Sequence, residues 1–295
     1  MPKKRMRACL AFHFVFLFFF LPQLDSAQEV QALQVEDFNL IHWAYAPAFG
    51  TGVYRVGENR EVYVLRVQPM FTYRFKFETV FKDRELVLEF KLPVTFGVYN
   101  FNFTDLLGGE FPDSVQQISF TPGVEIKLPV SNRWNLRFYG NLGYGSDTQG
   151  GGERAWIYWA GFMSRFVFPI KKLYLGIING YGSFGYTPNH GKPGDLSRLM
   201  NGFELDIPLG RIGSSEKPFF LKSHVLNFWY YDRVDFLEDP QRKPVTIGSE
   251  WEIGVAIGKA QRIKIWLFNI DRIGVAYRFS PKANGVRIYF ASYFR

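Results

Sequence analysis

Residues 61–79 alternate apolar and polar side chains at every second position. The odd positions carry Tyr63, Leu65, Val67, Pro69, Phe71, Tyr73, Phe75 and Phe77, and the even positions include Arg66, Gln68, Thr72, Arg74, Lys76 and Glu78. A period of two residues fits a β-strand, whose successive side chains point to opposite faces, and no helix can use it. The chain must therefore fold around at least one long strand with an apolar and a polar face.

The same period recurs along most of the chain. It predicts strands at 41–56, 61–79, 86–103, 117–130, 134–145, 155–168, 173–187, 198–209, 219–232, 246–258, 262–280 and 285–295. The connections between these segments alternate in length along the chain: the long connections occupy every second place, and those between them are mostly short. Outer-membrane barrels show the same alternation of long external loops and short periplasmic turns. We therefore expect an all-β fold, an up-and-down transmembrane antiparallel β-barrel of about 12 strands, with both termini periplasmic.

Several of these segments are longer than a transmembrane strand needs to be. A strand crosses a bilayer in roughly 9–11 residues. The segment 61–79 therefore either projects beyond the membrane or contains a bulge, for which Pro69 is the natural position because proline cannot donate to a strand ladder.

The N-terminus has the features of a secretory signal peptide. Its basic residues are Lys3, Lys4, Arg5 and Arg7. An apolar run at 8–21 follows, and Ala27 is a plausible cleavage position. The alternative, a membrane anchor helix, is disfavoured because this run is shorter than the roughly 18 apolar residues that span a bilayer. We expect a signal peptide at 1–27, a short periplasmic leader at 28–40 and an outer-membrane barrel at 41–295.

The composition excludes several classes of function. The single cysteine, Cys9, lies in the signal, so the mature chain offers no disulfide and no thiolate chemistry. The formal net charge of +8 falls to about +5 without the signal, which does not suggest nucleic-acid binding. Aromatic residues make up 19% of the chain, yet the mean hydropathy is only −0.09. A barrel in lipid combines these values because it turns aromatic side chains outward around a polar lumen.

Alternation alone does not say which face meets lipid, and a secreted soluble β-barrel or sandwich is the alternative. About twelve closed strands enclose more space than a simple apolar core fills, since roughly eight strands already make a filled interior. Aromatic residues at strand ends also suit the girdles at the two membrane interfaces. They are Tyr63, Tyr99, Trp134, Phe168, Tyr174, Trp229, Phe279 and Phe294. Both points favour the membrane barrel.

The final strand carries Val286, Ile288, Phe290 and Phe294 on one face. Residues 270–294 (IDRIGVAYRFSPKANGVRIYFASYF) join a strand that ends in Tyr-Arg-Phe, a short polar turn and this aromatic strand. The pattern resembles the solitary outer-membrane autotransporter-like β-barrel family, which implies a barrel of autotransporter type without a passenger. A terminal aromatic strand also resembles the signal read by the barrel-insertion machinery, although Arg295 follows the aromatic residue here.

Charged residues occupy the face opposite the apolar set. The residues expected to line the lumen are Arg66, Arg74, Lys76, Glu78, Glu89, Lys91, Glu125, Lys127, Arg137, Arg165, Glu204, Asp206, Glu250, Glu252, Lys264 and Arg287. They could line a water-filled pore and tune ion passage. Alternatively, they could form a paired network that plugs the barrel, because interior charges need partners or water. Both signs occur in comparable numbers, which favours the plug.

The sequence offers little for catalysis. His190 lies in an expected external loop near Asp195 and Ser197, and His224 lies beside Lys222 in an expected strand. Histidines have no metal-ligand spacing, so neither a metal nor a cofactor is expected. We expect a structural or small-pore barrel without catalysis whose partners are lipid and the insertion machinery. The alternatives are a partner-dependent secretion translocator, disfavoured by the short leader without a pore-plugging helix, and an outer-membrane hydrolase with a loop or rim site.

Overall fold

The computed structural model describes residues 43–56, 60–76, 85–99, 117–148, 153–190, 193–210, 218–236, 245–265 and 268–290, all within one compact unit, Asn39–Arg295. Two short helical turns, η2 (Trp43–Tyr45) and α2 (Ala46–Phe49), precede the strands. The strands are β1 (Gly52–Val56), β2 (Arg60–Val67), β3 (Met70–Lys76), β4 (Glu85–Lys91), β5 (Val94–Tyr99), β6 (Gln117–Phe120), β7 (Gly123–Pro129), β8 (Trp134–Asp147), β9 (Arg154–Ile170), β10 (Leu173–Pro188), β11 (Gly194–Gly210), β12 (Phe219–Phe236), β13 (Val245–Ile265), β14 (Phe268–Phe279) and β15 (Ala283–Tyr289).

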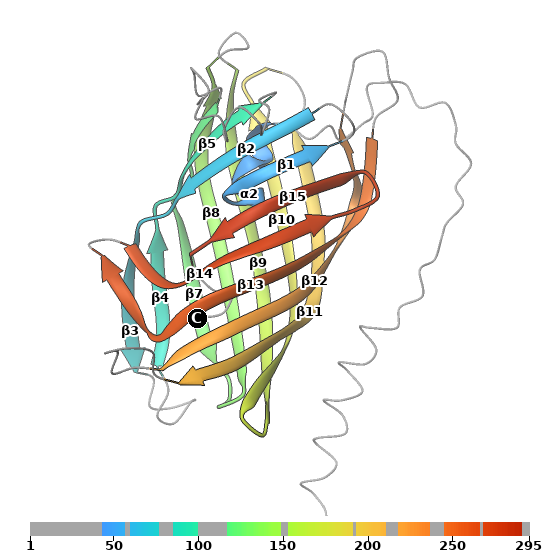
Figure 1. Cartoon of the computed structure of the whole chain (residues 1–295). Coiled ribbons are helices and arrows are strands. Elements are labelled where there is room, and N and C mark those ends of the chain that lie inside the picture. The colour runs from blue at the N-terminus through green and yellow to red at the C-terminus, as the bar shows by residue number, and fades with distance from the viewer. Residues whose placement is uncertain are drawn as a thin grey trace, which may run out of the picture. The chain divides into compact units, whose positions relative to one another are not determined.

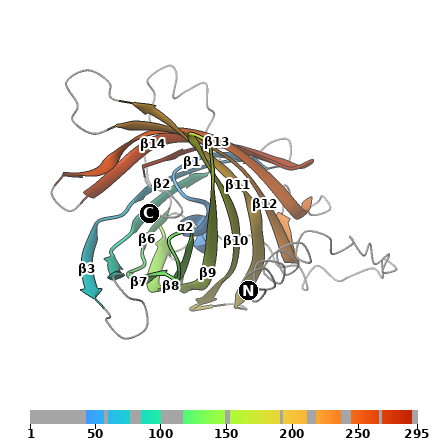
Figure 2. The ribbon, with the colours of Figure 1, turned by 90° about the horizontal axis from the view of Figure 1, so that it is seen from below.

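These segments form a closed antiparallel barrel of 12 strands with up-and-down topology (Figures 1 and 2). Neighbouring strands pair in sequence order from β8 to β15, and β15 pairs with β1 to close the barrel. The expected fold class and strand number are confirmed. No helix in the described part of the chain is long and apolar enough to cross a membrane.

Fifteen strand segments make twelve strands because three strands are each interrupted by a proline. The breaks fall at Pro69 between β2 and β3, at Pro93 between β4 and β5, and at Pro122 between β6 and β7. The three prolines lie in a row across neighbouring strands. The backbone N–H of Leu92 donates to the Pro69 carbonyl at 2.9 Å, and that of Thr121 donates to the Pro93 carbonyl at 3.1 Å. Since proline has no N–H to donate, this row interrupts the ladders and lets the wall bend.

The expected strand at 41–56 is wrong over most of its length. Residues 43–49 form η2 and α2, and β1 begins only at Gly52. The alternation of alanine with aromatic residues was compatible with a period of two, but alanine is the best helix former and Pro47 sits in the first turn of α2, where proline is tolerated. The second boundary error is smaller: β13 continues to Ile265, past the turn expected at 259–261.

The two faces of the wall are sorted by polarity. Large apolar side chains on the outer face are 37–56% exposed, among them Leu65, Phe71, Leu142, Ile253 and Ile273. The buried set includes Glu89, Glu125, Glu204, Lys222 and Glu252. A soluble barrel has the reverse arrangement, so this sorting identifies a barrel whose outer face lies in lipid.

The two ends of the barrel differ, and they are named here by their connections. The turn end carries the tight β9–β10 turn at Lys171 and Lys172. The loop end carries the β8–β9, β10–β11 and β12–β13 connections. The strand β1 runs only in the loop-end half, where residues 52–56 pair with residues 283–287 of β15. This short ladder is the closing seam of the barrel.

Candidate functional site: the barrel lumen

The loop-end half of the lumen contains a large buried apolar cluster. The buried cluster there contains Ala44, Tyr45, Ala155, Ile157, Trp159, Met163, Ile178, Phe184, Tyr186, Leu196, Met200, Leu226, Phe228, Tyr230, Ile247 and Ala283. Tyr45 of η2 lies edge-on against Tyr186 of β10, with ring centroids 5.2 Å apart. Apolar side chains therefore occupy part of the lumen beside the charged residues expected there. The sequence did contain an indication of this cluster. Strands β9 and β12 are apolar on both faces, and one face meets lipid while the other packs into the cluster.

The segment 43–49 lies within the barrel, where strands of the wall and two side-chain hydrogen bonds hold it. Its turns contact β2, β5, β9 and β10. At its end, the Tyr54 hydroxyl donates to the Phe49 carbonyl at 2.6 Å, and the Arg66 Nη1 donates to the Pro47 carbonyl at 2.9 Å. Because the last carbonyls of a helix need donors, these side chains anchor the segment as a plug inside the wall (Figure 1).

The first of three ion-pair clusters, cluster A, joins β4, β7 and β8. Lys127 pairs with Glu89 at 2.8 Å and with Glu125 at 3.5 Å, while Lys91 also pairs with Glu125. Arg137 approaches Glu125 at 3.5 Å. Glu89 and Glu125 are direct cross-strand partners, as are Lys127 and Arg137. Like charges directly opposite each other repel, and the diagonal pairs relieve that repulsion.

Cluster B lies toward the turn end, on β9, β11 and β12. Arg165 pairs with Glu204 and lies 3.1 Å from Asp206, and Lys222 lies 3.0 Å from each carboxylate. Arg165 reaches Glu204 across the intervening strand β10. Gly176 of β10 makes room there, since a Cβ at this position would lie 2.6 Å from the Glu204 Cγ.

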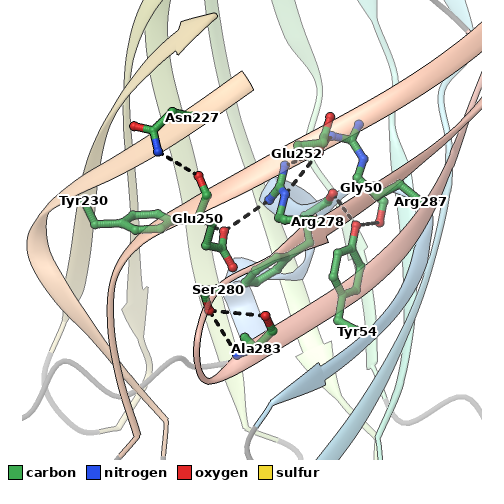
Figure 3. Close-up of polar contacts among 11 residues, drawn as sticks. Gly50, Tyr54, Asn227, Tyr230, Glu250, Glu252, Arg278, Ser280, Ala283 and Arg287 are labelled. Atoms are coloured by element: carbon green, nitrogen blue, oxygen red, sulfur yellow. Dashed lines mark hydrogen bonds and ion pairs between the residues drawn. The ribbon is translucent and has the colours of Figure 1, made fainter. Parts of the chain in front are cut away.

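Cluster C lies beside the closing seam on β12 to β15 (Figure 3). The carboxylate of Glu252 accepts from Arg278 and from Arg287, each at 2.9 Å, and lies 3.2 Å from the His224 Nε2. The Tyr230 hydroxyl donates to Glu250 at 2.6 Å. Arg278 therefore lies between two carboxylates, since it also approaches Glu250 at 3.7 Å.

The structure brings most of the expected lumen residues together in these clusters. Arg74 lies on the same face but is 62% exposed at the turn end, where it approaches Glu85 at 3.5 Å. The side chains of Lys76 and Lys264, and Glu78 entirely, lie outside the described residues. Sequence reasoning missed Arg198 and Arg278. Arg198 and Glu204 both occupy even positions of β11, so the two-residue period would have placed Arg198 on the inner face with Glu204.

The expected terminal strand corresponds to β15, which ends at Tyr289. Val286, Ile288 and Phe290 are exposed on the outer face at 50%, 44% and 47%. Phe294 lies outside the described residues.

Among the described residues, Arg66, Arg137, Arg198 and Arg278 lie over aromatic rings. Arg66 lies 5.3 Å from the Trp159 ring centroid, and Arg198 lies between the rings of Phe184 and Phe228, at 4.8 and 4.9 Å. Trp159 and Phe184 are direct cross-strand partners. Within the described residues, neither Arg66 nor Arg198 has a carboxylate within ion-pair distance. Both guanidinium groups lie over ring faces, which attract cations, and Arg66 also donates to the Pro47 carbonyl.

A cavity of about 270 Å³ separates the apolar half from cluster A. In the part of the chain that the structure describes, six cationic and two acidic side chains line it: Arg66, Lys91, Lys127, Arg137, Arg198 and Arg287, with Glu89 and Glu125. The plug contributes residues 47–49, and Gly50, which follows it, also lines the cavity. A second cavity, of about 340 Å³, lies beside cluster B.

The histidines do not form a rim site among the described residues. His190 is exposed at the end of β10. The Ser197 hydroxyl, in β11, accepts from Tyr181 and donates to Ser183. His224 is buried inside the barrel and faces Glu252, whose carboxylate also binds two arginines. A hydrolase site at a rim is therefore not supported by this geometry.

The comparisons with known proteins concern the fold. No family model and no curated protein matches the sequence. The β domain of the Bordetella autotransporter BrkA superposes with a TM-score of 0.52 at 8% identity, over 82% of this chain and 96% of that one. LpxR from Salmonella typhimurium superposes with a TM-score of 0.38 at 13% identity, over 76% of this chain and 88% of that one. The similarity to the BrkA β domain, together with the closed 12-strand barrel, shows an autotransporter-like barrel fold.

Proposed function

We propose that this protein is a sealed, non-catalytic outer-membrane barrel with a structural role. The observation that carries the proposal is the plug: residues 43–49 and the apolar cluster occupy the lumen toward the loop end, while ion pairs join neighbouring strands on the inner face of the wall. A general diffusion pore needs a continuous wet path lined by polar groups. An apolar cross-section packed around a helical turn opposes such a path.

Export by the N-terminal signal and insertion through the final strand belong to the same proposal. The outer face of β15 presents Val286, Ile288 and Phe290 to the membrane, in keeping with a terminal strand that the barrel-insertion machinery reads. The charged residues of clusters A, B and C then act as internal braces, since each cluster joins three or more strands.

Single-channel conductance in a planar bilayer tests the proposal. We expect the refolded mature barrel to be silent and a variant lacking residues 43–49 to show salt-dependent steps. A deletion of equal length at 28–34 is the matched control and should stay silent. Steady steps from the intact barrel, equal to those of the plug deletion, would contradict a sealed lumen. Silence from a folded plug deletion would assign the seal to the strand side chains alone.

A partner-dependent secretion translocator is the second candidate, and one observation favours it. The sequence argument against it was the lack of a pore-plugging helix in the leader, and the structure places a helical segment in the lumen directly before β1. Tyr45 lies near the loop end and Phe49 lies deeper, beside Tyr54. A translocator predicts that an epitope after Gln28 is cleaved by protease on intact cells, whereas a periplasmic leader predicts protection.

A further inference from the structure

Among the described residues, the central cavity is lined by more positive charges than carboxylates. In cluster A, Glu89 and Glu125 face three cations. Arg287 is balanced outside the cavity, by Glu252. Arg66 and Arg198 add two charges without a carboxylate within ion-pair distance among the described residues. A buried charge costs several kcal/mol unless it is paired, so this excess needs an explanation.

Arg66 and Arg198 lie over rings that come from neighbouring strands. Their rings, Trp159 and Phe184, are direct cross-strand partners on β9 and β10, a relation that puts Cβ atoms roughly 5 Å apart. Both arginines also line the same cavity. Stacking on rings orients each guanidinium plane but leaves its edge donors available, and an oxyanion accepts from such edges.

The hydrogen-bonding of Arg66 supports the same conclusion. Its Nη1 donates to the Pro47 carbonyl, while its Nε is buried without a hydrogen-bond partner. A buried donor left unpaired costs about 1–3 kcal/mol. A bound anion between the arginines would accept from such donors and balance the charge in the same place.

We propose that this cavity binds a small oxyanion of phosphate or sulfate type between Arg66 and Arg198. The volume of about 270 Å³ lies just below the roughly 300–1,000 Å³ of sites for drug-sized ligands, so the anionic group itself, free or carried on a lipid headgroup, is what the site accommodates. Lys91 and Lys127 extend the positive potential toward the turn end. The site is independent of conductance, because a sealed lumen still holds a cavity.

Equilibrium dialysis of labelled inorganic phosphate against the refolded mature barrel in detergent, at fixed ionic strength, tests the site. We expect saturable binding of one phosphate per barrel. Arg66→Gln and Arg198→Gln should each weaken binding at least tenfold, and the double variant should abolish it. Arg165→Gln is the matched control: it removes a buried arginine paired with carboxylates outside this cavity, and it should change binding less than twofold.

Two further measurements keep the outcome decisive. Arg198→Lys retains the charge and should retain binding within a few-fold, and heat-modifiable migration on gels shows which variants are folded. A short-chain phosphatidic acid is the second probe: competition that depends on Arg66 and Arg198, without binding of free phosphate, assigns the site to a lipid headgroup. No saturable binding of either probe by the folded barrel, or equal binding by all variants, would overturn the proposal.

Discussion

Glu252 is fully buried, and its carboxylate accepts hydrogen bonds from Arg278 and Arg287. One acidic side chain thereby ties β13 to β14 and β15, next to the seam where the barrel closes. Removing one partner of a buried ion pair costs more than the pair contributes, because the remaining charges stay buried without balance. Cluster C is therefore the most sensitive ionic site near the seam.

We expect Glu252→Gln to lower the free energy of unfolding by about 3 kcal/mol or more, measured by urea denaturation of the barrel in lipid vesicles. Glu85→Gln is the matched control. Its ion pair with Arg74 is 3.5 Å long and exposed, and exposed pairs contribute only about 0–1 kcal/mol. An equal loss of unfolding free energy in the two variants would mean that burial does not determine how much these ion pairs contribute to stability.

The alternation of inner and outer positions along each strand predicted many lumen residues but not their ion-pair partners. Glu89 and Lys127 could be placed on the inner face from the two-residue period, yet their pairing at 2.8 Å depends on which strands are neighbours. Glu89 and Glu125 even lie directly opposite each other. Register, and therefore the diagonal pairing, is a property of the assembled sheet.

At the scale of elements, the closing seam is one of the short ladders of the wall. β1 contributes only residues 52–56 to it, whereas β9 and β10 pair along nearly their full lengths. Gly52 sits where β1 meets β15. A Cβ at this position would lie 2.4 Å from the Val286 carbonyl oxygen, a contact that requires the backbone to shift.

We expect Gly52→Ala to destabilise the barrel by about 1–3 kcal/mol through overpacking, with faster amide hydrogen exchange confined to β1 and β15. Gly140→Ala on β8 is the control, because nothing lies within 4 Å of its added Cβ. The free energy of unfolding of the Gly140→Ala variant should stay within about 0.5 kcal/mol of that of the parent. Exchange that rises evenly around the barrel would show that the seam is not the local weak point.

For the whole molecule, the proposed role of the terminal strand in membrane insertion can be tested. Ile288 and Phe290 point outward from β15 at 44% and 47% exposure, so they reach the membrane side without packing into the lumen. Their loss should therefore affect recognition during insertion more than the stability of the finished barrel.

We expect the double variant Ile288→Ala with Phe290→Ala to reduce folded protein in outer-membrane fractions several-fold, measured by heat-modifiable migration on gels. The same variant should refold in detergent almost as the parent does. Phe75→Ala is the control, since it removes an outward aromatic that is 45% exposed on β3, away from the final strand. If all variants assemble equally in cells, the final strand is not the insertion signal.

The sequence by itself determined the fold class, the strand number and the outward apolar face. These follow from a period of two residues, which each strand carries locally whatever its neighbours are. The sequence did not determine the interior. Residues 43–49 alternate like a strand, but they coil because the closed wall offers them an apolar pocket lined by β9 and β10. Only the tertiary structure brought Arg66 and Arg198 to one cavity from strands far apart in the chain, because closure of the barrel, and not local periodicity, decides which inner faces meet.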